Sequence, residues 1–165
     1  MIAYHCDTNT ILRYTLASKN DKHRIPAYNS VMKRLAKRGH NVDVQVIDNE
    51  VSAEYKRVIT EEWEEKFQLV PPNVHQRNVA ERAIRTFKAR FLSVLAGVDP
   101  GFPKYMWDQL LVQMKLTLNL LRQATLNPHI SAREYFNGKF YFLATPLGQL
   151  GRKVVIHNTV TTQKI

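Results

Sequence analysis

The sequence predicts an α/β domain in which helices flank a mixed β-sheet. Short β-prone segments alternate with longer amphipathic ones, in the order hairpin, helix, strand, helix, strand, helix, helix. The length of 165 residues suits about one domain. The hydrophobic fraction of 44% is typical of a globular chain and too high for a disordered one. We find no internal repeat, low-complexity tract or linker in the sequence, so we expect one layered domain.

Local periodicity and turn chemistry give the expected elements. In order, they are a hairpin of residues 2–5 and 11–16, a helix over 26–37, a strand over 42–47, a helix over 53–66, a strand over 67–70, a helix reaching 95, a helix over 104–122, a short helix over 132–136 and a final strand over 153–157.

Turn and capping residues justify the first two elements. The triplet Asp-Thr-Asn at 7–9 supplies the turn of the hairpin. Residues 18–25 are polar and predict a loop. Pro26 then suits the first turn of a helix, and Gly39 suits its C-terminal cap. Apolar residues recur at helical spacing between these two points and face a basic side.

Caps and breakers bound the middle elements. The strand over 42–47 alternates and is rich in Val and Ile. Ser52 can cap the next helix, whose acidic cluster at 61–65 is interpreted as a solvated face. Pro71 and Pro72 end the strand that follows.

The later helices are amphipathic. The helix reaching residue 95 has a core side made of Ala80, Ile84, Phe87, Phe91 and Leu95. The helix over 104–122 carries an apolar stripe, interpreted as core with a dimer contact as the alternative. Ser131 can cap the short helix after it.

Charge and cysteine content limit the partners. A formal net charge of +10 predicts an anionic partner such as nucleic acid or an anionic membrane surface. A single cysteine, Cys6, excludes an internal disulfide and suggests a reducing compartment. The six histidines are scattered, so a structural zinc site is not expected. No apolar run approaches the ~20 residues that a membrane helix needs.

One carboxylate stands out in the basic stretch from Gln68 to Arg90. At ~100° per residue, Glu81, Arg85 and Lys88 share one exposed helix face. Such a group can form an i,i+4 ion pair worth ~0.3–0.5 kcal/mol. It can also be a metal-binding carboxylate flanked by cations that grip phosphate. Spacing alone leaves both interpretations open.

A second carboxylate, Asp48, stands at the carboxyl end of a predicted strand. The carboxyl ends of strands are where α/β sheets collect ligand-binding groups. Two carboxylates brought together are costly to ionise unless a cation lies between them. Mg²⁺ accepts such oxygen ligands and bridges to phosphate. The alternative for Asp48 is a strand-end turn residue or cap.

Several motifs in order now carry a resemblance. They are VIDNE at 46–50, QLVPP at 68–72, HQRNVAERAIRTFK at 75–88, WDQLL at 107–111, TLNLLR at 117–122, SAREYFNG at 131–138 and TPLGQLGRKVVIHN at 145–158. The chain resembles, over essentially its whole length, the integrase of copia-like LTR retrotransposons. This resemblance implies an RNase H-like mixed sheet flanked by helices.

The resemblance also implies a chemistry. Such integrases perform 3′-end processing and strand transfer, with two aspartates and a glutamate binding Mg²⁺ or Mn²⁺. Asp48 matches the second aspartate and Glu81 the glutamate, so both are expected to be catalytic metal ligands. Arg85 and Lys88 match basic positions that hold the DNA end. Further DNA-binding candidates are Arg82, Arg77, His75 and the loop over 71–78.

The chain departs from the family at three places. The family's first aspartate lies on a strand before the hairpin, and that central strand is missing here; Asp7 is expected to be a turn residue instead. Arg152 replaces a cysteine that relatives tend to carry, and we have no physical account of it. The upstream zinc-binding segment is also absent. We therefore expect an N-terminally truncated fragment with little or no catalytic activity.

Loss of the central strand carries a structural expectation as well. It would leave two facing rows of unpaired backbone groups, so we expect low stability or a sheet that closes by other pairing. Residues 1–125 are expected to form a partial catalytic core and 126–165 its C-terminal extension. Expected partners are retroelement and target DNA, with a homo-oligomer possible and no membrane, in cytoplasm and nucleus. The alternative function is a non-catalytic nucleic-acid-binding remnant or a decayed copy.

Overall fold

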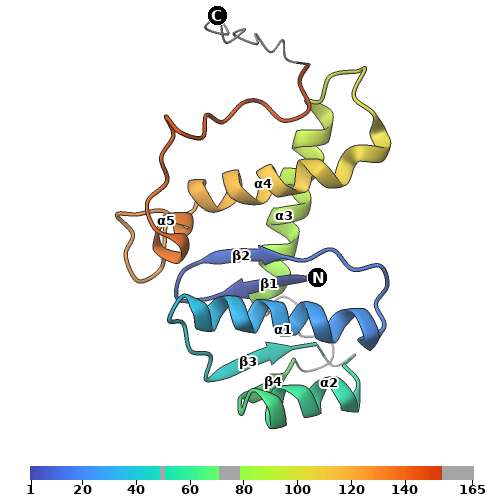
Figure 1. Cartoon of the computed structure of the whole chain (residues 1–165), viewed down its shortest axis with the longest axis vertical. Coiled ribbons are helices and arrows are strands. Elements are labelled where there is room, and N and C mark those ends of the chain that lie inside the picture. The colour runs from blue at the N-terminus through green and yellow to red at the C-terminus, as the bar shows by residue number, and fades with distance from the viewer. Residues whose placement is uncertain (49–50, 71–78, 154–165) are drawn as a thin grey trace, which may run out of the picture.

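The computed structural model describes residues 1–48, 51–70 and 79–153 (Figure 1). Within these ranges the elements are β1 (Ile2–His5), β2 (Thr10–Arg13), α1 (Asp21–Lys37), β3 (Val44–Ile47), α2 (Ala53–Arg57), a π-helical turn (Val58–Glu62), β4 (Lys66–Leu69), α3 (Val79–Ala96), a 3₁₀ turn (Lys104–Met106), α4 (Trp107–Leu121) and α5 (Ala132–Asn137). The expected α/β class is confirmed.

The strands form two separate two-stranded sheets. β1 and β2 make the predicted antiparallel hairpin, with Ile2 opposite Arg13. β3 and β4 run parallel, with Val44 opposite Lys66. Figure 1 shows the order β2, β1, β3, β4 across the molecule, with α1 crossing in front of the interval between the two pairs. In the described part of the chain, no strand joins the pairs into one sheet.

The edge of β1 that faces away from β2 has no strand partner in the described ranges. Met1 and Tyr14 exchange both of their backbone hydrogen bonds, at N···O distances of 2.7 and 2.9 Å. Pairing alternates along an antiparallel ladder, so the peptide groups of Ile2 and Tyr4 turn away from β2. These groups point toward the position that an added strand would take.

β3 has a similar edge. Its Ile47 carbonyl accepts a hydrogen bond from the Val70 amide, 3.0 Å away, which lies on the β4 side. Alternate residues of a strand face the same neighbour, so the peptide groups of Val44 and Val46 turn away from β4. The Val44 and Val46 residues are also 53% and 52% exposed. β3 is therefore an incompletely covered strand.

Two apolar clusters hold the elements together. The first surrounds α1 and has the buried members Leu12, Tyr28, Val31, Met32, Leu35, Tyr55, Val58, Ile59 and Phe136. The second lies between the hairpin, α3 and α4 and has the buried members Ile11, Ala83, Phe87, Leu111, Met114 and Leu118. Ile11 and Leu12 join different clusters because successive strand residues point to opposite faces. The hairpin is thus packed on both faces.

α1 begins at Asp21, inside the stretch predicted as a loop, and Pro26 lies within the helix instead of opening it. The Asn20 carbonyl accepts hydrogen bonds from the amides three and four residues later, both at 3.0 Å, so a first turn precedes the proline. Proline removes one intrahelical hydrogen bond there, and packing of Ile25 on the first cluster offsets the loss. Gly39, with φ of +75°, follows the helix as predicted.

The helix after Ser52 is shorter than predicted. Ser52 caps it as expected, because its hydroxyl accepts a hydrogen bond from the Tyr55 amide at 3.0 Å. After α2 the chain makes the π-helical turn, which buries Val58 and Ile59. Glu64 then adopts a φ of +54°, and this left-handed residue ends the helical path before β4.

Glu65 corrects the prediction that the acidic cluster is wholly a solvated face. Its residue is 9% exposed, and its carboxylate accepts hydrogen bonds from the Tyr28 hydroxyl and the Gln45 side-chain amide. Burial raises the pKa of Glu65, although the hydrogen bonds from Gln45 and Tyr28 oppose that shift. Position at the entry to β4, rather than on the helix, explains why the helical pattern misplaced it.

The ends of the later helices also differ from the predictions. Residues 104–106 form a 3₁₀ turn, and Trp107 is half exposed, edge-on to Phe91 with ring centroids 5.9 Å apart. Leu121 and Leu95 are exposed because the apolar stripe rotates off the core at helix ends. Ser131 caps α5 as expected, accepting from the Glu134 amide. Residues 154–157 of the predicted final strand lie outside the described ranges.

Candidate functional site

Asp48 directly follows β3 and is exposed. In the parallel pair Ile47 lies opposite Leu69, so β3 and β4 end together. The chain therefore leaves β4 at the same end of the parallel pair at which Asp48 follows β3. The carboxyl ends of strands are where α/β proteins place ligand-binding groups.

Glu81 lies in the first turn of α3 and is half-buried. Arg85 and Lys88 follow it one and two turns later, and both are exposed. The helix is held by Ala83 and Phe87, which are buried against the hairpin and α4. The predicted polar face of α3 is therefore the face that its core packing leaves toward solvent. A carboxylate near a helix N-terminus is also favoured by the helix dipole.

The remaining predicted site residues separate into two groups. Arg82 is described and exposed, next to Glu81 on α3. Arg77, His75 and the loop over 71–78 lie outside the described residues. Asp7 occupies the turn between β1 and β2, where its carbonyl accepts from the Leu126 amide at 3.1 Å. Its position is that of the predicted turn residue.

Asp48 and Glu81 offer oxygen ligands of the kind that Mg²⁺ prefers. Among the described residues, no group of three His, Cys, Asp or Glu side chains gathers that could hold a metal ion. The chemical type of these two ligands therefore fits a divalent ion. A pair of catalytic ions, which clamps both oxygens of a phosphoryl transfer, needs additional ligands.

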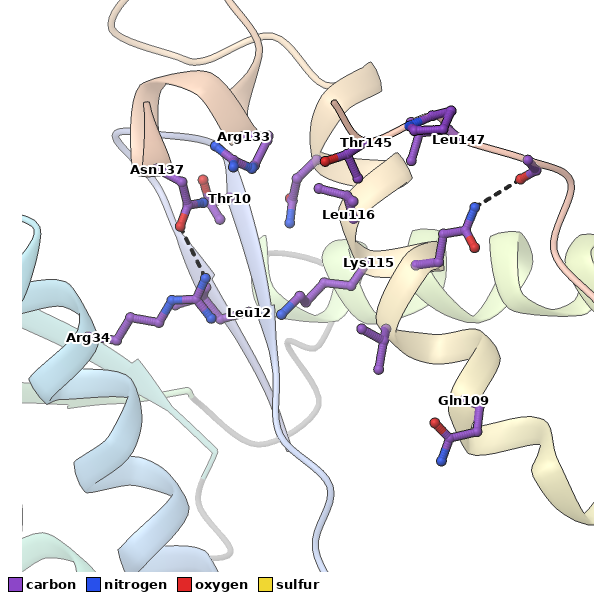
Figure 2. Close-up of a pocket in the computed structure, with 15 residues that line it drawn as sticks. Thr10, Leu12, Arg34, Gln109, Lys115, Leu116, Arg133, Asn137, Thr145 and Leu147 are labelled. Atoms are coloured by element: carbon purple, nitrogen blue, oxygen red, sulfur yellow. Dashed lines mark hydrogen bonds between the residues drawn. The ribbon is translucent and has the colours of Figure 1, made fainter. Parts of the chain in front are cut away.

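A second polar site, made of Arg34, Lys115 and Arg133, was not predicted from the sequence. These three cations line one cavity between α1, α4 and α5 (Figure 2). The basic side of the helix over 26–37 was a partial signal for Arg34. The convergence of three separate helices has no local signature, so the sequence pattern alone did not reveal it.

No protein-family model matches the sequence, and no curated protein matches it either. Across the ranges that the structure describes, every helix is too short or too polar to cross a membrane.

Proposed function

We propose that this chain is part of the catalytic core of an integrase of the copia-like LTR retrotransposon type. In this proposal the fold is RNase H-like, and the 165 residues lack its central strand. The chain binds DNA through the exposed face of α3. Asp48 and Glu81 are two of the ligands for Mg²⁺ or Mn²⁺ in polynucleotidyl transfer.

The observation that carries the proposal is that β3, which Asp48 follows, and β4, which precedes α3 in the chain, end side by side. Because β3 and β4 are parallel and end together at Ile47 and Leu69, the chain leaves β4 beside Asp48. It then enters the helix that carries Glu81 in its first turn. This connection favours one site for both carboxylates, although they are separated by more than thirty residues in the sequence.

The division of the sheet also supports the proposal. The peptide groups that turn away from β2 and β4 belong to β1 and β3, the strands that flank the interval in Figure 1. An additional strand between them would give one continuous sheet with mixed directions. The sequence resemblance implies a strand with an aspartate between β1 and β3. That aspartate would add a third carboxylate beside Asp48.

A bound Mg²⁺ would stabilise the negative charge that develops on phosphate oxygens during transfer. In the proposed site Asp48 and Glu81 hold this ion with their carboxylates. Arg85 and Lys88 neutralise DNA phosphates near the ion and position the strand end. Arg82 adds a third cation on the exposed side of α3.

DNA binding tests the α3 surface. We expect a fluorescein-labelled duplex to bind with a strong salt dependence, measured by anisotropy across a NaCl series. Replacing both Arg85 and Lys88 with Ala removes two phosphate contacts, so the slope of log K against log[salt] should fall by about 2. The matched control replaces exposed Lys33 and Lys37 of α1 with Ala, which changes the net charge equally. An equal effect in both double variants would contradict the proposed surface.

Catalysis tests the two carboxylates. The coding sequence before the Met1 codon should be read for an in-frame β-prone segment that contains an aspartate. The longer product should then perform Mg²⁺-dependent strand transfer into a plasmid and lose it with Asp48→Asn or Glu81→Gln. Strand transfer that survives both substitutions would contradict the proposal. Salt-dependent DNA binding without any transfer, unchanged by either substitution, would favour the non-catalytic nucleic-acid-binding alternative.

A further inference from the structure

A cavity of about 660 Å³ lies between β2, the last turns of α1, α4, α5 and residues 145–148 (Figure 2). Its size is in the range of pockets that bind small molecules. The cavity lies on other elements than Asp48 and Glu81, and neither carboxylate lines it. It is therefore a second candidate site, independent of the proposed integrase chemistry.

Three cations from three helices line this cavity. Arg34 of α1 donates a hydrogen bond to Asn137 Oδ1 at 3.2 Å, and its guanidinium lies 5.5 Å from the centroid of the Phe136 ring. Arg133 of α5 donates to the Gly138 carbonyl at 2.6 Å. Each guanidinium has five N–H donors, so most of its donors remain available to a ligand. These contacts hold the two guanidinium groups in place and use only some of their hydrogen-bond donors.

Lys115 completes the group from α4. Figure 2 shows its side chain extending toward the guanidinium of Arg34. It is half-buried, and its ammonium has no hydrogen bond or ion pair within the described residues. Burial lowers the pKa of Lys115, and the charges of Arg34 and Arg13 lower it further. The ammonium is thus held among like charges in a partly desolvated position.

The positive charge of the cavity is poorly compensated. Burial lowers the pKa of Arg133, as do Arg38 and Arg34, and Glu134 alone is an opposing influence on that group. The residues that line the cavity in the described ranges include no carboxylate. Like charges brought together in a concave, partly desolvated site favour an anion between them. Guanidinium groups match the geometry of phosphate oxygens especially well.

Part of the lining suits a ring. This apolar wall is formed by Leu116, Pro146 and Leu147, while Gln109 and Gln113 bring amide groups to the same cavity. Such a combination of an apolar wall, a few amides and a cationic end is complementary to a nucleotide. The base would lie on the apolar wall, and the phosphate would lie among the cations.

We propose that this cavity is a nucleotide-phosphate site. Arg34, Lys115 and Arg133 bind the phosphate, and the apolar wall of Leu116, Pro146 and Leu147 contacts the base. The phosphate can belong to a free mononucleotide or to the 5′ end of a nucleic acid strand. Both sources present the same chemistry to the cavity.

Isothermal titration calorimetry with deoxyadenosine 5′-monophosphate tests the site. Lys115→Met and Arg133→Met each remove one charge and keep an unbranched apolar side chain, and each should weaken binding about tenfold. Lys37→Met changes the net charge equally on an exposed position of α1 outside the cavity, and it should bind as the wild type does. Deoxyadenosine, which lacks the phosphate, should bind at least tenfold more weakly than the monophosphate. Thermal unfolding of each variant checks that it is folded; if Lys115→Met is not, Arg133→Met decides.

Oligonucleotides distinguish the two sources. If the site takes a strand end, a short single strand with a 5′-phosphate should bind more tightly than the same strand without it, and Lys115→Met should remove that difference. If the site takes a free nucleotide, only the mononucleotide should depend on Lys115. Equal monophosphate binding by the wild type, Lys115→Met and Arg133→Met would overturn the proposal. Binding of a hexaglutamate peptide in place of the monophosphate would also overturn it.

Discussion

At the scale of single residues, Asn119 links α4 to the hairpin. Its side-chain oxygen accepts from the Ile11 amide, and its side-chain nitrogen donates to the Ile11 carbonyl, both at 2.9 Å. Asn119 is buried, and Ile11 is fully buried. The amide therefore satisfies both polar groups that the outer edge of β2 presents at this position. A strand edge is closed here by one side chain instead of another strand.

Replacing Asn119 with Ala should destabilise the fold by about 2–4 kcal/mol, because two buried backbone groups lose their partners. Urea unfolding followed by circular dichroism measures this change. Gln109→Ala, an exposed substitution on the same helix, should change the free energy of unfolding by less than about 0.5 kcal/mol. A loss below about 1 kcal/mol for Asn119→Ala would mean that water replaces the side chain at β2.

Glu65 makes the stability pH-dependent. Its pKa is raised by burial, so the native state retains a proton that the unfolded state loses above the ordinary value of 4.5. The native state then binds more protons, and stability must fall as the pH rises from 4.5 through the raised pKa. Glu65→Gln keeps an acceptor for Gln45 and Tyr28 and should remove this part of the fall.

Thermal unfolding between pH 4 and pH 8 checks the prediction for Glu65. The difference in melting temperature between Glu65→Gln and the wild type should grow with pH. Glu61→Gln is the control, since this exposed acid pairs with Arg57 at 3.7 Å on the surface and should leave the pH profile nearly unchanged. A pH-independent difference for Glu65→Gln would contradict the assignment.

At the scale of elements, side-chain caps define the short helices. Ser52 and Ser131 each precede a helix of five or six residues and accept a hydrogen bond from an amide three residues later, at 3.0 Å. Helices this short are marginal by themselves. Burial of Tyr55 in α2 and of Phe136 in α5 supplies the rest of their stabilisation. Cap and packing therefore act together in both elements.

Ser131→Ala should cost about 1 kcal/mol of stability, because the capping hydrogen bond to the Glu134 amide is lost. Chemical denaturation measures the cost. Ser93→Ala is the matched control: this exposed hydroxyl donates to the Ala89 carbonyl inside α3, where the helix already satisfies the backbone. Restoration of the stability by Ser131→Asp would confirm a capping role, and no loss in Ser131→Ala would contradict it.

At the scale of the whole molecule, the divided sheet is the dominant feature. Its two pairs present the peptide groups of Ile2, Tyr4, Val44 and Val46 on edges that no described strand covers. Such edges promote association between chains. Low stability of the isolated chain stays a prediction. A cooperative unfolding transition above ~45 °C from a soluble monomer would count against it.

Val46→Lys should reduce self-association, because a charge on the open strand disfavours pairing with another chain. Sedimentation velocity over a concentration series measures this effect. Leu92→Lys is the control, since it makes a similar change at an exposed position of helix α3, where there is no strand edge. Equal association of Val46→Lys, Leu92→Lys and the wild type would show that this edge does not drive association.

The local sequence was sufficient where one neighbourhood decides the structure. The turn at residues 7–9, the caps at Ser52 and Ser131 and the glycine after α1 were all predicted correctly, because each depends on backbone geometry within a few residues. The polar face of α3 was also predicted, since helical spacing places Arg85 and Lys88 on one side. The start of α1 was predicted wrongly at Pro26, because packing outweighed the usual preference of proline for the first turn of a helix.

The sequence by itself determined the type of most elements, their caps and the exposed cations of α3. Tertiary structure alone decided that Glu65 is buried, that Asn119 closes the edge of β2 and that three cations meet in one cavity. It also decided that the strands form two sheets. The physical reason is the distance along the chain over which each feature is decided. Periodicity within an element indicates which face is apolar, whereas the partner of that face depends on segments distant in the chain.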